Sequence, residues 1–193
     1  MEVEGLRINV SPQVYPPSED SYLLLDAIKN LRAGKALEVG CGCGLISMVL
    51  ALNSVEVFAI DVSREACVNT LQNSKRNSLR GIIHVINGDM ATALRRGLRF
   101  DLIVSNPPYL PVEQSAKEDV SWAAGRDNFL SKKLLENTLP LLSDRGVMLL
   151  VQSSLSDMGG LKRLMEKRGF KMEEASHKEF FFERIIVFKI SKR

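Results

Sequence analysis

The sequence predicts an α/β fold in which a mostly parallel, seven-stranded sheet carries helices on both faces. Short apolar runs alternate with longer amphipathic stretches along most of the 193 residues, which is the rhythm of strand–helix–strand units. The exception comes near the end, where residues 170–176 and 180–190 are two strand-like runs separated by a short polar turn. No crossover helix fits between them, so they are expected to pair as a C-terminal antiparallel hairpin.

The first elements surround a loop rich in proline. Residues 6–10 are expected to form a short strand, and residues 11–17 a loop, because prolines exclude a helix there. A helix is expected to begin at Ser18, since the next two residues are acidic and suit a helix N-terminus. Gly34 is expected to end this helix, whose apolar residues recur at helical spacing: Leu23, Leu24, Ala27, Ile28 and Leu31.

The remaining elements mostly alternate between strands and helices. Each expected parallel strand is an apolar run short enough to be buried on both faces of a sheet. These strands are residues 36–39, 55–60, 82–86, 102–104 and 147–151. The amphipathic stretches expected to form helices are residues 45–52, 63–77, 128–142 and 157–168.

Length and composition are those of one compact domain spanning residues 1–193. Hydrophobic residues make up 45% of the chain and charged residues 25%, enough for one substantial core. The net charge of +3 is a weak cationic bias without the concentrated basic stripe of a nucleic-acid-binding protein. A nucleic-acid partner is therefore not favoured, although transient contact with RNA remains open.

Cysteine usage indicates a reducing compartment. The count of three is odd, and two of the cysteines, Cys41 and Cys43, lie within one glycine-rich loop, which argues against a disulfide framework. With only Cys67, His84 and His177 besides, no set of metal ligands has a recognisable spacing, so no metal is expected. No leader and no apolar stretch of about 18 residues is evident, so we expect a cytoplasmic protein that does not enter a membrane.

A glycine-rich loop follows the first parallel strand. Glu38 lies in that strand, and Gly40, Cys41, Gly42 and Gly44 form the turn into the next helix. Glycines let the backbone approach a ligand at the carboxyl edge of an open α/β sheet. The Gly-x-Gly-x-Gly pattern lacks the Gly-x-x-Gly ending that brings a helix N-terminus onto a pyrophosphate, so it favours a ligand without phosphates.

Two aspartates mark the ends of the next two strands. Asp61, followed by Val62, comes about 20 residues after the glycine loop, where an acidic side chain can accept hydrogen bonds from both ribose hydroxyls. Asp89, followed by Met90, is expected within reach of an adenine amino group. The glycine loop, Asp61 and Asp89 together predict a binding site for a nucleoside without phosphate groups. S-adenosyl-L-methionine and its product S-adenosyl-L-homocysteine are such ligands. Alternatively, each aspartate only caps the helix that follows it.

The most informative motif is Asn106-Pro107-Pro108-Tyr109, directly after the strand at residues 102–104. Two prolines fix the backbone and remove two N–H donors, so the carbonyl groups stay free to accept hydrogen bonds from a ligand. The Asn106 oxygen and the Pro107 carbonyl form two acceptors on one rigid turn, which suits the two hydrogens of a planar amino or amide nitrogen. Tyr109 can cover the flat face of such a group. Asn106 is expected to contact the cofactor as well.

The chain resembles the class I methyltransferases, and within them the short archaeal and eukaryotic branch of the HemK family of protein glutamine methyltransferases. The segments that carry the resemblance are residues 14–26, 37–40, Asp61, 106–109 and 122–126. The resemblance implies a Rossmann-like fold and N5-methylation of the glutamine in the Gly-Gly-Gln tip of a class I translation release factor. It also implies a small zinc-binding activator protein as partner in a heterodimer.

The resemblance assigns roles to further residues. It implies that residues 1–34 form a segment that closes over the site and that residues 35–193 form the catalytic core. Within the first segment, Pro16, Glu19 and Ser21 are implied to contact the cofactor. Trp122 and Arg126 are implied to contact the substrate. Simpler alternatives stay open: Glu19 and Ser21 as the first turn of a helix, and Trp122 and Arg126 as anchors of their loop.

A rival function uses the same acceptor turn. Methyltransferases that act on the exocyclic amine of adenine (N6) or guanine (N2) share Asn-Pro-Pro-Tyr, and they act on a base extruded from its stack. The motif therefore identifies the target atom, and the modest charge of the chain disfavours nucleic acid as the molecule that carries it. The aromatic run 180–182 is expected to be part of a strand that covers the sheet.

Overall fold

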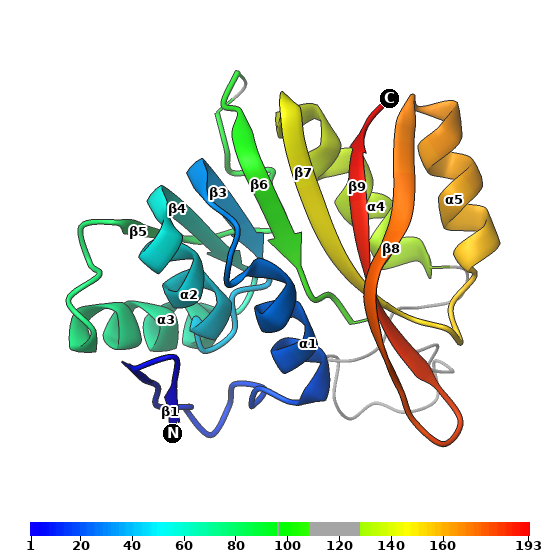
Figure 1. Cartoon of the computed structure of the whole chain (residues 1–193). Helices are drawn as coiled ribbons and strands as arrows, with labels where there is room; N and C mark the ends of the chain where they lie inside the picture. Colours follow the sequence, from blue (N-terminus) through cyan, green and yellow to red (C-terminus); the bar gives the residue numbers. More distant parts are fainter. Residues whose placement is uncertain (96, 109–127) are drawn as a thin grey trace.

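Seven strands form one sheet in the computed structural model, which describes residues 1–95, 97–108 and 128–193 (Figure 1). Their bounds are β3 Ala33–Val39, β4 Ser54–Asp61, β5 Ile83–Asn87, β6 Phe100–Ser105, β7 Leu142–Ser153, β8 Phe170–Glu179 and β9 Arg184–Lys192. The order across the sheet is β5-β4-β3-β6-β7-β9-β8. The first five in this order are parallel, whereas β9 runs antiparallel to both β7 and β8. The expected α/β sheet with its C-terminal antiparallel hairpin is confirmed.

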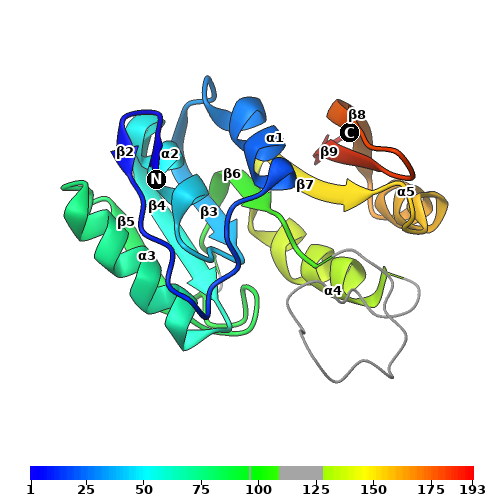
Figure 2. The same ribbon diagram turned by 90° about the horizontal axis from the view of Figure 1, so that it is seen from below.

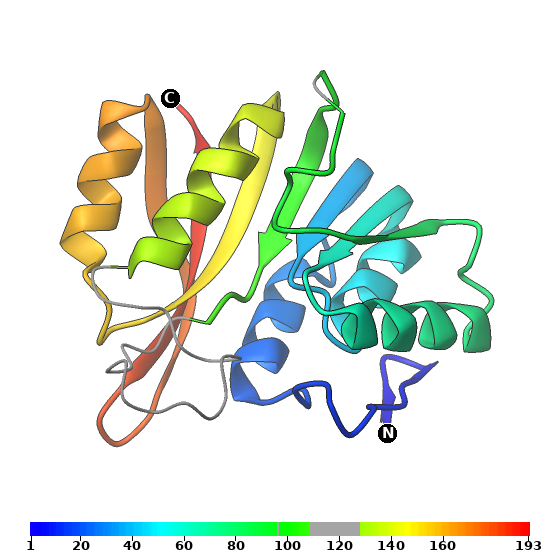
Figure 3. The same cartoon turned by 180° about the vertical axis from the view of Figure 1, so that it is seen from behind.

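The sheet separates two apolar cores. One face is covered by α1 (Glu19–Ile28), α2 (Leu45–Asn53) and α3 (Arg64–Arg76), and the other by α4 (Phe129–Thr138) and α5 (Met158–Lys167). Figure 2 shows α1 and α4 on opposite sides of the sheet, and Figure 3 shows α4 and α5 from behind. Because the central strands are covered on both faces, a ligand reaches them only at their ends.

The first long helix is shorter than predicted. α1 begins after Ser18, as expected, but it ends at Ile28, and Gly34 lies inside β3. The Asp101 carboxylate accepts hydrogen bonds from the backbone N–H groups of Gly34 and Lys35, both at 3.1 Å, which holds this segment in the sheet. The prediction that Gly34 ends the helix was wrong, because a partner distant in sequence recruits it into the strand.

The N-terminal strand is also shorter than predicted. Only Leu6–Arg7 of residues 6–10 is a strand, β2, which pairs with β1 (Glu2–Val3) in a separate small hairpin. The rest of residues 6–10 has no strand partner among the described residues and crosses α3 instead.

Pro140 shortens another predicted helix. α4 ends at Thr138, and a 3₁₀ turn over Leu139–Leu141 leads directly into β7. Proline lacks the backbone N–H that an α-helix interior needs, so the last turn tightens. The predicted helix over residues 128–142 was therefore too long, and β7 begins at Leu142.

The aromatic run 180–182 lies at the tip of the hairpin between β8 and β9 and does not belong to a strand. Phe181 is 91% exposed and Phe182 83%, so the prediction that this run covers the sheet was wrong. No helix within the described ranges is long and apolar enough to cross a membrane.

Candidate active site

A cavity of about 600 Å³ opens at the carboxyl edge of β3, β4 and β6. It lies where the sheet order changes direction from β3 to β4 on one side and to β6 on the other, the usual ligand position in open α/β folds. Most of the predicted site residues that the structure describes line this one cavity: Ser21, Glu38, Gly40, Cys41, Gly42, Asp61, Val62, Asp89, Met90, Asn106, Pro107 and Pro108. The sequence prediction thus converges on one place in the fold.

Three predicted cofactor residues, Pro16, Glu19 and Gly44, are not among those that line the cavity. Gly44 is the N-cap of α2, with φ at +83°. A Cβ atom at Gly44 would meet the Thr70 side chain at 2.8 Å, so glycine is required there by backbone and packing. The Glu19 carboxylate forms an ion pair with Lys178 of β8 instead of facing the cavity.

The glycine loop is held against the end of β4. The backbone N–H groups of Gly40 and Cys41 both donate to the Ile60 carbonyl, at 2.8 and 3.1 Å. Gly40 has φ at +86°, and a Cβ atom there would meet nothing within 4 Å, so the conformation rather than crowding requires glycine. The loop therefore exposes backbone to the cavity.

Asp61 is fixed by backbone donors on both carboxylate oxygens. Oδ2 accepts from Gly42 N–H and Oδ1 from Ser63 N–H, each at 2.9 Å. Ser63, and not Asp61, caps α3, because the Ser63 hydroxyl accepts from Ala66 N–H at 3.2 Å. Asp61 thus joins the glycine loop to the end of β4, and each carboxylate oxygen can accept a further hydrogen bond.

Glu38 is a buried carboxyl group that lines the cavity. Its side chain is only 4% exposed, and Ser47 of α2 donates a hydrogen bond to Oε2. Burial raises the pKa of Glu38 from 4.5 to about 8, with a further contribution from the negative charge of Asp61 and against the effect of the Ser47 hydrogen bond. At neutral pH the carboxyl group is therefore largely protonated as long as no cation lies beside it.

Asp89 lies at the rim of the cavity. Its carboxylate accepts a hydrogen bond from Lys133 of α4 at 2.7 Å, and its side chain is 53% exposed. Met90 follows with φ at +52°, a backbone conformation that is uncommon outside glycine. The pairing with Lys133 was not predicted, because the two residues are far apart in sequence.

The Asn-Pro-Pro turn begins at the end of β6. Ser105 is buried, and its hydroxyl donates to the Val39 carbonyl at 2.7 Å, which joins the ends of β6 and β3. The Asn106 Oδ1 atom is buried and accepts no hydrogen bond from any described residue, although the residue lines the cavity. Such an unpaired buried acceptor is costly unless a ligand satisfies it. Tyr109, Trp122 and Arg126 lie outside the described residues.

An asparagine ladder formed by two residues of α3 and its C-cap, not predicted from the sequence, holds part of the N-terminal segment against this helix. Asn69, Asn73 and Asn77 are four residues apart and so lie on one side of the helix. Their carboxamide groups donate to and accept from backbone groups of residues 7–11 at distances of 2.7 to 3.0 Å. Asn73 also donates to the Cys43 carbonyl of the glycine loop at 2.9 Å. The spacing of the three asparagines was the available signal.

The segment that follows residues 7–11 contributes to the wall of the cavity. Gln13, Val14, Tyr15 and Pro17 line it, although only Pro16, Glu19 and Ser21 were predicted from this part of the chain. These four residues come directly after the segment that the asparagines bind.

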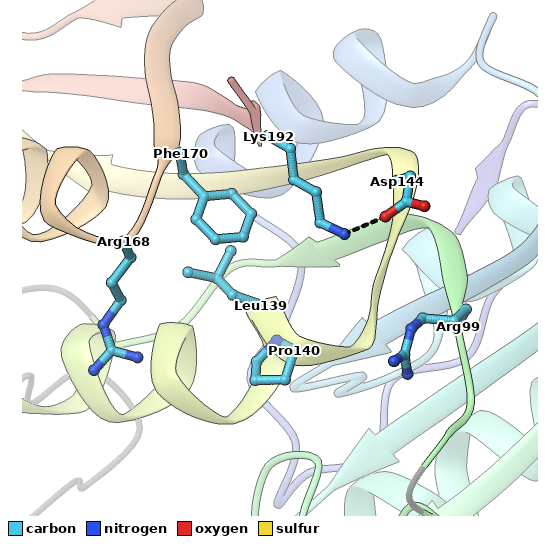
Figure 4. Close-up of a pocket in the computed structure, with 7 residues that line it drawn as sticks. All are labelled: Arg99, Leu139, Pro140, Asp144, Arg168, Phe170 and Lys192. Atoms are coloured by element: carbon cyan, nitrogen blue, oxygen red, sulfur yellow. Dashed lines mark hydrogen bonds and ion pairs between the residues drawn. The ribbon is translucent and has the colours of Figure 1, made fainter.

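A second hollow, of about 520 Å³, lies at the opposite edge of the sheet (Figure 4). Its charged residues are largely paired, because Lys192 binds Asp144 and Arg168 binds Glu136, both at 2.6 Å. It shares no residue with the cavity beside the Asn-Pro-Pro turn.

Comparisons with known proteins identify the family of this chain. The family of methyltransferase small domains matches residues 18–181. A relative from Methanocaldococcus jannaschii, the provisionally named protein N5-glutamine methyltransferase MJ0928, is 31% identical over 97% of this chain and 96% of its own. The eRF1 methyltransferase catalytic subunit mtq2 of Schizosaccharomyces pombe is 27% identical over 96% of this chain and 92% of its own.

Solved structures with the same fold include two methyltransferases. The E. cuniculi Mtq2–Trm112 complex, responsible for methylation of the eRF1 translation termination factor, has a TM-score of 0.70 at 19% identity and covers 93% of this chain and 99% of its own. The T. thermophilus 16S rRNA N2 G1207 methyltransferase RsmC, solved with AdoMet and guanosine, has a TM-score of 0.74 at 20% identity and covers 100% of this chain and 49% of its own. At these identities the likeness establishes the Rossmann-like fold.

Proposed function

Because this chain belongs to the methyltransferase small domain family and is related over nearly its whole length to protein glutamine methyltransferases, we propose that it methylates N5 of a glutamine side chain. The methyl donor is S-adenosylmethionine, and the substrate is the Gly-Gly-Gln loop of a class I translation release factor. The observation that carries this proposal is the Asn106 oxygen, a buried acceptor without a partner among the described residues at the wall of the cavity.

The residues of the cavity fit this cofactor. A volume of about 600 Å³ is typical of small-ligand sites. The Asp61 carboxylate is already oriented by Gly42 and Ser63, so its free lone pairs can accept the ribose hydroxyls without rearrangement. Met90 and Val62 offer apolar contact for a base beside Asp89. When bound, S-adenosylmethionine supplies a methyl group made electrophilic by a positively charged sulfur.

The chain's own contribution is to position the amide. An amide nitrogen is a poor nucleophile, because its lone pair is delocalised into the carbonyl group. Asn106 Oδ1 and the Pro107 carbonyl each accept one N–H of the substrate NH₂ group and so fix its plane and direction. Orientation of this kind can contribute about 7 to 11 kcal/mol to lowering a barrier.

Proton transfer needs no strong base in this scheme. Once the new N–C bond has formed, the nitrogen is acidic, and its surplus proton passes to water. Neither of the two histidines of the chain, His84 and His177, lines the cavity. Tyr109, Trp122 and Arg126 remain proposed contacts of the substrate, and Pro16, Glu19 and Gly44 proposed supports of the cofactor.

The substrate and partner follow from the relatives. The mtq2 relative is named as the catalytic subunit of an eRF1 methyltransferase, and a neighbour of the same fold is a complex of Mtq2 with Trm112. For this chain we propose a release factor as substrate and a small zinc-binding activator as partner.

Mass spectrometry of the release factor tests this function. After incubation with the protein and S-adenosylmethionine, with and without the activator, the tryptic peptide that contains Gly-Gly-Gln should gain one methyl group on the glutamine. Total RNA and DNA with labelled cofactor form the competing arm. Label on nucleic acid and none on the release factor would establish the rival function instead.

The Asn106→Ala variant tests the acceptor turn. The rate of methyl transfer should fall at least about 100-fold, as after removal of one preorganised hydrogen-bonding group elsewhere. Cofactor affinity, measured by calorimetry, should stay within a few fold. The matched control is Asn30→Ala at an exposed position outside the cavity, which should leave both quantities unchanged. Unchanged turnover in the Asn106 variant would remove this residue from its assigned role.

A further inference from the structure

The hairpin between β8 and β9 carries an exposed aromatic tip, defined as Phe181 and Phe182. The two rings pack edge to face, with centroids 4.6 Å apart and an interplanar angle of 87°. A hydrogen bond from Phe180 N–H to the Glu183 carbonyl, at 2.7 Å, closes the turn beneath them. The aromatic tip therefore has a defined shape, yet 91% of Phe181 and 83% of Phe182 is exposed to solvent.

The aromatic tip projects from the same edge of the sheet as the cavity. β7 ends at this edge, and Ser154 just beyond it donates from its N–H to the carbonyl of Arg184, the first residue of β9, at 2.8 Å. Figure 1 shows the hairpin extending past the carboxyl end of β7, beside α1. The ion pair between Lys178 and Glu19 ties the hairpin to the first turn of α1, whose next residues Asp20 and Ser21 line the cavity.

Two more exposed apolar side chains, Leu155 and Phe129, lie at this edge of the sheet. Leu155 follows the carboxyl end of β7 and is 55% exposed. Phe129 is the first residue of α4 and 64% exposed, and the next residue, Leu130, lines the cavity. The N-termini of α4 and α5 are joined here, because Asn128 donates to the Asp157 carbonyl at 2.9 Å. Scattered single apolar residues need no explanation, but a series at the mouth of a site indicates an interaction surface.

The charged residues around the aromatic tip indicate which class of molecule can bind there. From residue 174 to residue 184 the hairpin holds three glutamates against one lysine and one arginine, with one histidine. Both basic side chains already form ion pairs with glutamates, Lys178 with Glu19 and Arg184 with Glu174. A nucleic acid would meet net negative charge here, so phosphate contacts are disfavoured. A protein with an apolar depression and a basic rim is complementary.

We propose that the aromatic tip is a docking site for the protein substrate, where Phe181 and Phe182 insert into an apolar depression outside the loop that carries the methylated glutamine. This inference rests on the proposed function, because it names the release factor as the occupant. Large aromatic side chains are typical anchors of protein interfaces. The tip would hold the body of the substrate while its loop reaches the Asn-Pro-Pro turn.

The test compares two double variants of the full-length enzyme with its activator present. Phe181→Ser with Phe182→Ser removes the aromatic tip. Leu31→Ser with Leu52→Ser is the matched control, since these side chains are also exposed but precede β3 and β4 at the opposite edge. For the intact release factor, the tip variant should raise KM at least about tenfold and leave kcat within twofold. The control variant should change neither parameter, and cofactor affinity should be equal in all three proteins.

The outcomes are distinguishable. A wild-type enzyme that leaves the release factor unmethylated contradicts the proposed function, and the docking site with it. Methylation by the wild type with an unchanged KM in the tip variant contradicts the docking site alone. Loss of the activator from the tip variant in gel filtration would assign the aromatic tip to the subunit interface instead. A fall in kcat without a rise in KM would show an effect on the cavity and equally overturn the docking role.

Discussion

The protonation state of Glu38 leads to a prediction that can be worked out from the structure. The carboxyl group is 4% exposed, and burial raises its pKa from 4.5 to about 8. Between these two values the unfolded chain has released the proton and the folded chain still holds it. Stability contributed by this group is therefore fully present below about pH 4.5 and is lost as the pH rises toward 8.

Linkage gives the magnitude. One proton bound only in the folded state corresponds to a slope of about 1.4 kcal/mol per pH unit. From pH 5.5 to pH 7.5 the wild type should thus lose roughly 2 to 3 kcal/mol of unfolding free energy through Glu38 alone. Glu38→Gln has no titrating group at this position, and its amide oxygen can still accept the hydrogen bond from Ser47.

Urea unfolding at pH 5.5, 6.5 and 7.5, without cofactor, measures the effect. The free energy of the Glu38→Gln variant relative to wild type should rise by about 2 to 3 kcal/mol across this window, whatever its offset at pH 5.5. Glu2→Gln, at an exposed position in β1, should give a constant difference. A Glu38→Gln difference that stays constant within about 0.5 kcal/mol would mean that the buried carboxyl group is ionised in the folded protein.

Two further substitutions test the supports of the site. Asn73→Ala should lower the free energy of unfolding by at least about 3 kcal/mol, because it removes three hydrogen bonds to backbone groups at 2.7 to 3.0 Å. The control variant Asn137→Ala loses one hydrogen bond within its own helix, so its free energy of unfolding should stay within about 0.5 kcal/mol of the wild type. Equal losses of unfolding free energy in the two variants, measured by urea unfolding, would contradict a stabilising role for the asparagine ladder. Gly44→Ala should destabilise by about 2 kcal/mol or more in thermal unfolding, because φ is +83° and the new Cβ would lie 2.8 Å from Thr70. Gly81→Ala meets nothing within 4 Å and should be neutral or slightly stabilising; similar melting temperatures for the two variants would refute the argument.

Local chemistry explains why much of the fold was predictable. Runs such as β4 and β6 are apolar because both faces of these strands are covered, and that pattern is written in consecutive residues. The start of α1 after Ser18 and the capping of α3 by Ser63 depend on a few neighbouring residues. At Gly34 the prediction failed because a distant partner, the Asp101 carboxylate, draws this residue into β3.

The hairpin tip illustrates a second limit. Three consecutive phenylalanines have strong strand propensity, and nothing in their own chemistry distinguishes a strand from a turn. The register of β8 against β9 pairs Glu179 with Arg184 and leaves residues 180–183 as the connection. Pairing over the whole length of two strands therefore outweighs the preference of three residues.

The amino-acid sequence by itself determined the alternation of elements, the glycine turn and the stiff pair of acceptors at Asn106 and Pro107, because each depends on residues adjacent in the chain. Only the tertiary structure decided that these parts surround one cavity, that Asn69, Asn73 and Asn77 hold residues 7–11 against α3, and that Asp89 pairs with Lys133. Such contacts join residues far apart in sequence, and no local pattern records them. The parts of the cavity meet because parallel strands bring their carboxyl ends to one edge of the sheet.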